Sequence, residues 1–219
     1  MPKIRVTIII TLSLSVLLLS PCTATVFAQT QTPLEKRQAV KERVTEKKEN
    51  LQEKVQAKRE EAKTKAKAKR EELKLKIQTI KDEKKKAVVE RLDTKLADVN
   101  SKRTDQMSQN LEKLTEVLGK INTKAADAKT QGKDTTAVDA AISSAQSAID
   151  AATTAVTAQA GKEYVITVET EANLRSTVGL TTSQMQSDLR ATHATVVLTK
   201  QTVQNAAQEL RKAIGTTIQ

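Results

Sequence analysis

The stretch AKREEAKTKAK-AKREELKLKIQ, residues 57–78, decides how this chain folds. It consists of two copies of an eleven-residue unit, and the same period extends over six rows from Glu35 to Asn100. Two positions of the unit form apolar columns and another is acidic in most rows. The first apolar column is Val40, Leu51, Ala62 and Leu73, continued by Lys84 and Lys95, and the second is Val44, Val55, Ala66, Ile77, Val88 and Val99.

An eleven-residue period fills three helical turns at about 3.67 residues per turn, close to the period of the α-helix itself. Because no proline follows Pro33, we predict one continuous helix from Pro33 to Ala125. Its first part, residues 34–88, is predicted to be a basic coiled-coil arm. Acidic and basic side chains three or four residues apart support such a helix by about 0.2–0.5 kcal/mol per pair. Alanine fills the seam near its middle, so association along the seam should be weak there.

After Val99 the apolar spacing changes from eleven residues to seven. Three heptad segments joined by Gly-containing turns predict an antiparallel three-helix bundle over residues 89–214. Its helices are expected at about 89–130, 135–160 and 182–214, followed by a tail at 215–219. The predicted fold class is therefore all-α, with a long N-terminal hendecad helix running into a small antiparallel helical bundle. The heptad positions are Met107, Leu111, Leu114, Leu118, Ile121, Ala125, Val138, Ile142, Ala145, Ile149, Ala152, Val156, Leu189, Val196, Val203 and Leu210.

Residues 163–181 lie between the last two predicted helices and show no clear period. The β-branched stretch Tyr164–Val168 favours a strand by propensity. A lone strand with no partner is unstable in water. Helix, strand and irregular structure all remain open for this segment, and we favour a helix or an irregular linker.

The N-terminal residues have the pattern of a cleaved export signal. A short basic region precedes an apolar run at Val6–Leu19, and Val26 and Ala28 are small residues at the positions that a signal peptidase requires before Gln29. We predict a signal peptide at 1–28, a linker at 29–33, and a protein exported to the periplasm, the cell envelope or the medium. A lipoprotein anchored through Cys22 and an uncleaved anchor are the alternatives.

Basic charge is confined to one part of the chain. Residues 34–105 contain 24 lysine and arginine residues against 15 acidic residues, a net charge of +9, whereas residues 106–219 contain 11 of each. Clustered cations attract phosphates and anionic lipid headgroups. The predicted contact residues for an anionic surface are Lys63, Lys65, Lys67, Lys69, Arg70, Lys74 and Lys76. The alternative interpretation is a solvated face that keeps the helix apart from its copies.

Catalytic and cofactor motifs are absent from the sequence. It contains no glycine-rich phosphate loop, no serine elbow and no HExxH motif. The only histidine, His193, is expected on the flank of a helix, partly buried, with no second metal ligand near it in sequence. Specific nucleic-acid binding is disfavoured because 1% of the residues are aromatic and few side chains could stack on bases. We predict no enzymatic activity, no small-molecule substrate, no cofactor and no metal.

Three resemblances follow from these residues. The rows AKREEAKTKAK and AKREELKLKIQ resemble the eleven-residue repeats of group 3 late-embryogenesis-abundant proteins and of exchangeable apolipoproteins. The layout of a signal peptide, a Lys/Glu helix, the stretch ERLDTKLADVNSKRTDQMSQNLEKLTEVLGKI and an Ala/Thr-rich tail is similar to uncharacterised exported coiled-coil proteins of bacteria. The signal peptide with a basic arm also resembles periplasmic holdase chaperones of the Skp kind.

These observations predict an exported, non-enzymatic structural or interaction protein. Its basic coiled-coil arm would contact an anionic envelope surface, such as wall polymer or lipid headgroups, or a partner helix. The chain could also form a homo-oligomer through the coiled coil. A periplasmic-type holdase chaperone and a protective protein like the late-embryogenesis-abundant group are the alternative functions.

Overall fold

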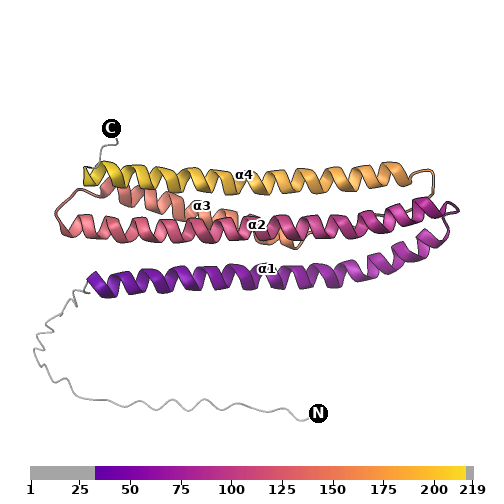
Figure 1. Ribbon diagram of the computed structural model, residues 1–219, viewed down its shortest axis with the longest axis horizontal. Coiled ribbons are helices and arrows are strands. Elements are labelled where there is room, and N and C mark those ends of the chain that lie inside the picture. The colour runs from indigo at the N-terminus through magenta and orange to yellow at the C-terminus, as the bar shows by residue number, and fades with distance from the viewer. Residues whose placement is uncertain (1–32, 216–219) are drawn as a thin grey trace, which may run out of the picture. The chain divides into compact units, whose positions relative to one another are not determined.

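The computed structural model describes residues 33–215, which form four helices and belong to one compact unit (Figure 1). They are α1 (Pro33–Gln78), α2 (Glu83–Thr130), α3 (Thr136–Ala160) and α4 (Leu174–Ile214). The predicted all-α class is confirmed. The predicted signal peptide at 1–28, the linker up to residue 32 and the tail beyond Gly215 lie outside the described residues.

The prediction of one continuous helix from Pro33 to Ala125 is wrong, because the chain reverses between α1 and α2. Ile80 is 2% exposed in this turn and anchors it in the core. Asp82 caps α2, since its Oδ1 accepts hydrogen bonds from the backbone N–H of Lys84 at 2.9 Å and of Lys85 at 3.3 Å. The hairpin buries the apolar columns of α1 against its own chain, and a straight helix would leave them uncovered.

The contacts of α1 with α2 repeat with a period of eleven residues. Its inward positions recur at steps of four, four and three residues, and besides the two apolar columns they include a third column that is basic. Each cation of this column forms an ion pair with an acidic residue of α2. Successive cations are eleven residues apart on α1, and their partners are eleven or twelve residues apart on α2, in reverse order because the helices are antiparallel. The pairs are Arg37–Asp127 at 2.9 Å, Lys48–Glu116 at 2.7 Å, Arg59–Asp105 at 2.7 Å and Arg70–Asp93 at 2.9 Å.

We call these four ion pairs the charge ladder, and Arg59 is its most buried cation, at 9% exposure. Besides its ion pair with Asp105, its Nη2 donates to the carbonyl of Ser101 at 3.0 Å and to Oγ1 of the fully buried Thr104 at 2.7 Å. A buried guanidinium is tolerated only where acceptors surround it. The ladder therefore fixes the register of the α1–α2 hairpin where the seam holds only alanine.

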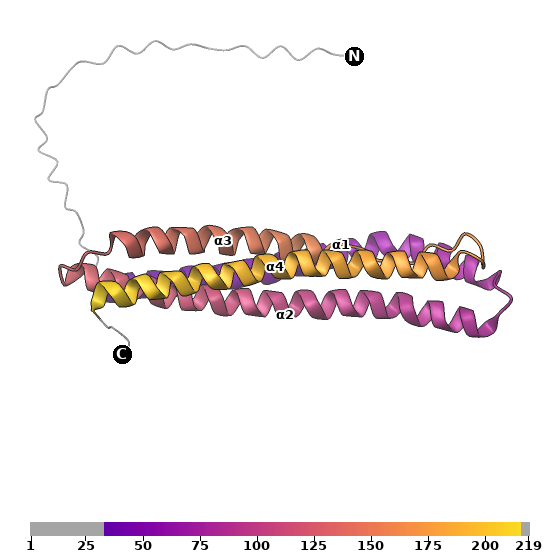
Figure 2. The same cartoon turned by 90° about the horizontal axis from the view of Figure 1, so that it is seen from above.

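The helices α2 and α3 form the middle of the bundle. Both α1 and α4 pack against this pair from opposite sides (Figure 1), and within residues 33–215 they make no close backbone contact, although they overlap in the view from above (Figure 2). The chain direction alternates, so that α1 and α3 run one way and α2 and α4 the other (Figure 1). Gly119 on α2 faces α1, where an added Cβ would lie 2.8 Å from Val44 Cγ2.

Three clusters of buried side chains make up the core. The central cluster joins all four helices through Leu51, Leu111, Val156 and Val196. A second cluster lies near the α2–α3 turn, where α2, α3 and α4 meet. Because α1 supplies residues to two of the three clusters, the division into a separate arm at 34–88 and a three-helix bundle at 89–214 does not describe this packing.

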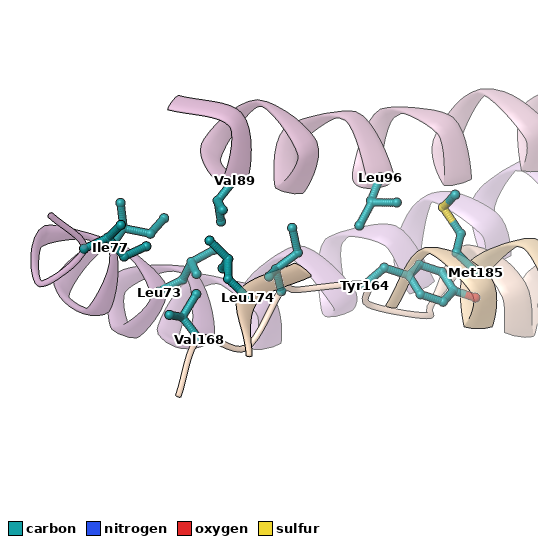
Figure 3. Close-up of a cluster of buried hydrophobic side chains, with 10 residues drawn as sticks. Leu73, Ile77, Val89, Leu96, Tyr164, Val168, Leu174 and Met185 are labelled. Carbon is teal, nitrogen blue, oxygen red and sulfur yellow. The ribbon is translucent and has the colours of Figure 1, made fainter. Parts of the chain in front are cut away.

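The third cluster contains the segment whose structure the sequence left open. The helix α3 ends at Ala160, far short of the other helices, and an irregular segment continues along the bundle in its place. Tyr164, Ile166 and Val168 alternate into the core and pack with Leu73, Leu96 and Met185 (Figure 3). Of the segment 163–181, residues 163–173 are therefore irregular and residues 174–181 are helical, and no strand occurs between residues 33 and 215.

The predicted helix bounds are close for two of the three bundle helices. The helix expected at 135–160 is α3. The helix expected at about 89–130 is α2, which ends at the expected residue but begins six residues earlier than expected, at Glu83. The last helix begins at Leu174 instead of about 182, because its first turns cover the third cluster. Among the described helices, none is both long enough and apolar enough to span a membrane.

Candidate functional site

The structure distributes the predicted cationic contact residues over two flanks of α1. Residues four apart share a helix face, so Lys63 and Lys67 lie on one flank and Lys65 and Lys69 on the other. Ala62 and Ala66, which are 8% and 3% exposed, face the bundle between them. Arg70 is half-buried and belongs to the charge ladder between α1 and α2, where it pairs with Asp93. The seven predicted residues therefore do not form one cationic face.

Most of these cations also have acidic partners nearby. Lys63 pairs with Glu60 at 2.7 Å, and Lys65 pairs with Glu61 one turn away. The same spacing joins Lys74 to Glu71 and Lys76 to Glu72, and Lys69 reaches Glu163 in the segment after α3 at 3.2 Å. Lys67 is the member for which the described residues supply no ion pair. Because most of these cations are paired with carboxylates, little uncompensated positive charge is left on this part of α1.

These pairs lower the pKa of several carboxyl groups. Hydrogen bonds from Lys58 and Lys65 lower the pKa of Glu61 from 4.5 to about 2, and Lys48 and Lys76 lower the pKa of Glu116 and of Glu72 in the same way. A carboxyl group whose pKa is lowered by folding stabilises the fold at pH values above the pKa that it has in the unfolded chain. That stabilisation is lost as the pH falls through the pKa that the group has in the folded protein.

We therefore expect the free energy of unfolding to fall as the pH drops from 4.5 toward 2, the window set by Glu61. Urea denaturation followed by circular dichroism at pH 7, pH 4 and pH 2 measures this change. In the variant Glu61→Gln the same loss should be smaller. A stability that does not differ between pH 7 and pH 2 would show that the pairs contribute nothing.

A groove between α2 and α4 brings together cations that the sequence did not connect. It is open to solvent and has a volume of about 760 Å³. Its floor is apolar and combines the buried Leu96, Met107 and Met185 with the half-buried Leu92, Val99 and Leu189. This volume lies in the range of small-molecule and cofactor sites, about 300–1,000 Å³.

Basic and amide side chains form the rim of this groove. Lys95 and Arg103 line it from α2 and Arg190 lines it from α4, and all three are exposed. Arg103 donates to Gln106 at 3.2 Å and Arg190 donates to Gln186 at 3.3 Å. No carboxylate lines the groove, and none of the three cations has an ion pair within residues 33–215. Their charges are therefore available to an anionic ligand.

A polar network holds the α4 wall of the groove in place. The Tyr164 hydroxyl donates to Asp188 of α4 at 2.7 Å and accepts from Gln159 at 2.8 Å, and Lys162 pairs with Asp188 at 3.0 Å. Burial, together with the hydrogen bond to Asp188, raises the pKa of Tyr164 far above its usual value. Burial alone would raise the pKa of Asp188, but the hydrogen bonds from Tyr164, Lys162 and Gln184 outweigh it and lower the pKa. Asp188 therefore stays ionised and keeps α4 fixed beside the groove.

No family model, curated protein or solved structure matches this chain.

His193 lies at the edge of the groove and is exposed, whereas the sequence indicated a partly buried position. Within the described part of the chain, no three His, Cys, Asp or Glu side chains are grouped as a metal site would need. The groove offers apolar contacts and positive charge, which suit the binding of an amphiphilic anion.

One signal in the sequence pointed to this groove. Lys95 occupies the column that holds Val40, Leu51, Ala62 and Leu73 in earlier rows. A cation in an apolar column indicates that the helix face there reaches solvent. Arg190 could not be connected with it, because no pattern in the sequence gives the register between α2 and α4.

Proposed function

We propose that this chain is an exported, non-enzymatic interaction protein that binds an anionic amphiphile of the cell envelope, such as an anionic lipid or a polymer carrying a lipid. Lys95, Arg103 and Arg190 around an apolar groove without a carboxylate are the observation that supports this proposal. Export rests on the N-terminal pattern with Val26 and Ala28.

The groove has separate contacts for the apolar part and for the anionic part of such a ligand. An acyl chain would lie along Leu92, Val99 and Leu189, where each buried methylene contributes about 0.8 kcal/mol. The anionic group would lie near Arg103 and Arg190, and each cation near an anionic surface contributes about 1 kcal/mol. The binding contacts thus lie on α2 and α4, whereas the sequence indicated the lysines of α1.

Co-sedimentation with vesicles tests the proposal. The protein should bind phosphatidylglycerol vesicles at low salt, bind them less at about 0.5 M salt, where screening acts within about 4 Å, and bind phosphatidylcholine vesicles weakly. The double variant Arg103→Gln, Arg190→Gln should weaken binding to anionic vesicles by about thirtyfold, because each of the two cations contributes about 1 kcal/mol. Soluble polyphosphate, which carries negative charge but no acyl chain, serves as a comparison. A site for an amphiphile should bind it more weakly than it binds the anionic vesicles.

The matched control is Lys74→Gln, Lys76→Gln, which removes two cations already paired with Glu71 and Glu72. This control should bind like the unchanged protein. If it loses more affinity than the groove variant, the lysines of α1 carry the function and the groove does not. If neither variant changes binding, the proposal of a charged contact surface is wrong.

A holdase chaperone remains the second candidate, because Met107 and Met185 give the groove floor an adaptable surface. Suppression of the aggregation of a chemically unfolded client, unaffected by salt and by Arg103→Gln, would favour this function over the first.

A further inference from the structure

The two helical hairpins of the bundle are closed by different kinds of turn. The turn between α2 and α3 contains Gly132 at φ 78°, a left-handed conformation that other residues rarely adopt. The turn between α1 and α2, residues 79–82, contains neither glycine nor proline. No residue other than glycine has a positive φ in the described part of the chain. Every residue of the first turn could therefore also be helical.

The eleven-residue pattern also continues through this turn. Ile77 in α1 and Val88 in α2 are successive members of one apolar column. The residues that follow the turn, Glu83 to Lys86, favour helices. The sequence is thus compatible with a straight helix as well as with the hairpin, and the cap by Asp82 and the burial of Ile80 favour the hairpin.

The register of the charge ladder would also allow α1 of one molecule to pack on α2 of another. Pairs such as Lys48–Glu116 and Arg59–Asp105 are spaced equally on both sides of the turn. Two straightened α1–α2 helices laid antiparallel, with residue 82 of both at a twofold axis, would bring the residues of these pairs together and would place Arg70 within one residue of the register it has with Asp93. Each contact that α1 makes with α2 would then form with the second copy instead.

We propose that α1 exchanges between two copies of this chain, so that each copy's α1 packs on the α2 and α3 of the other in a domain-swapped dimer. Such a dimer keeps the ladder and the core contacts of α1 and gives up the cap at Asp82 in both chains. It also presents two copies of the α2–α4 groove, which would strengthen contact with a surface carrying many ligands.

The variant Asp82→Ala tests the exchange, because it removes the cap and places a strong helix former in the turn. Loss of one cap in each of two chains should raise the dimer association constant by about thirtyfold, as measured by light scattering after size-exclusion chromatography. The matched control is Asp134→Ala in the other turn, where Asp134 accepts from Thr136 N–H at 2.9 Å and Gly132 opposes a straight helix. It should leave the association constant unchanged. Lys81→Gly should lower it.

The identity of the interface is tested by crosslinking in a background with Cys22→Ser. One copy carries Lys48→Cys and the other Glu116→Cys, and a short bismaleimide should join them in a mixed sample. Lys74→Cys with Glu116→Cys should give little product. A monomer at all concentrations for Asp82→Ala, with its helicity retained, would overturn the proposal. A dimer without the link between positions 48 and 116 would also overturn it.

Discussion

Replacing Leu111 by Ala should lower the free energy of unfolding by about 2–5 kcal/mol. Leu111 is fully buried, in the cluster that joins α1 through Leu51, α3 through Val156 and α4 through Val196. The cavity left by the missing side chain would face all four helices, and the small residues Ala152 and Ala160 offer little to fill it. Urea denaturation followed by circular dichroism measures the loss.

The matched control is Leu75→Ala, on the outer side of α1 at 66% exposure. Both substitutions keep strong helix formers, so a difference between them reports burial and not propensity. The change for Leu75→Ala should stay within about 0.5 kcal/mol. Equal losses for the two variants would mean that the central cluster is not a packed core.

A fragment that begins at Glu83 and lacks α1 should not unfold cooperatively. Removal of α1 takes away Leu51, Val55, Leu73 and Ile77, all at most 5% exposed, and each contributes about 1.5–3 kcal/mol by burial. Their sum is comparable to the whole stability of a typical domain, about 5–15 kcal/mol. Thermal circular dichroism of residues 83–215 should therefore show a broad, non-cooperative loss of helix.

Two further samples make this result specific. A chain lacking only residues 33–47, which carry the half-buried Val40 and Val44, should still unfold cooperatively. Addition of a separate peptide of residues 33–78 to the fragment should restore a cooperative transition, since the contacts of α1 do not depend on the turn. A fragment as stable as the whole chain would instead support an independent bundle after residue 88.

The helices of this protein could be predicted from the sequence because their periods are long and regular. The heptad residues Met107, Leu111, Leu118 and Ile121 are buried as that pattern indicates. The turn at 79–82 could not be predicted, because local signals for a helix and for a reversal are nearly balanced there. Tertiary burial of Ile80, which no local pattern records, decides the outcome.

The candidate site was harder to predict than the fold. Lysine and arginine have long apolar stems and can turn inward while their charge finds a partner. Arg70 is therefore among the predicted surface cations, although it faces α2 and pairs with Asp93. The groove depends on the lateral position of α4 against α2. That position is stabilised by the hydrogen bond between Asp188 of α4 and Tyr164 of the irregular segment, which lie 24 residues apart.

The matched spacing of the charge ladder on α1 and α2 also means that the length of the hairpin can change only in steps of about eleven residues per helix. Insertion of one further eleven-residue row into α1 and of eleven residues into α2 would leave every existing pair, such as Lys48–Glu116, in register. Each such double insertion would lengthen the hairpin by about 16 Å. An insertion in α1 alone would shift all pairs on one side of it. Duplications within this gene would thus be tolerated in matched steps, and the reach of the hairpin would change by whole units.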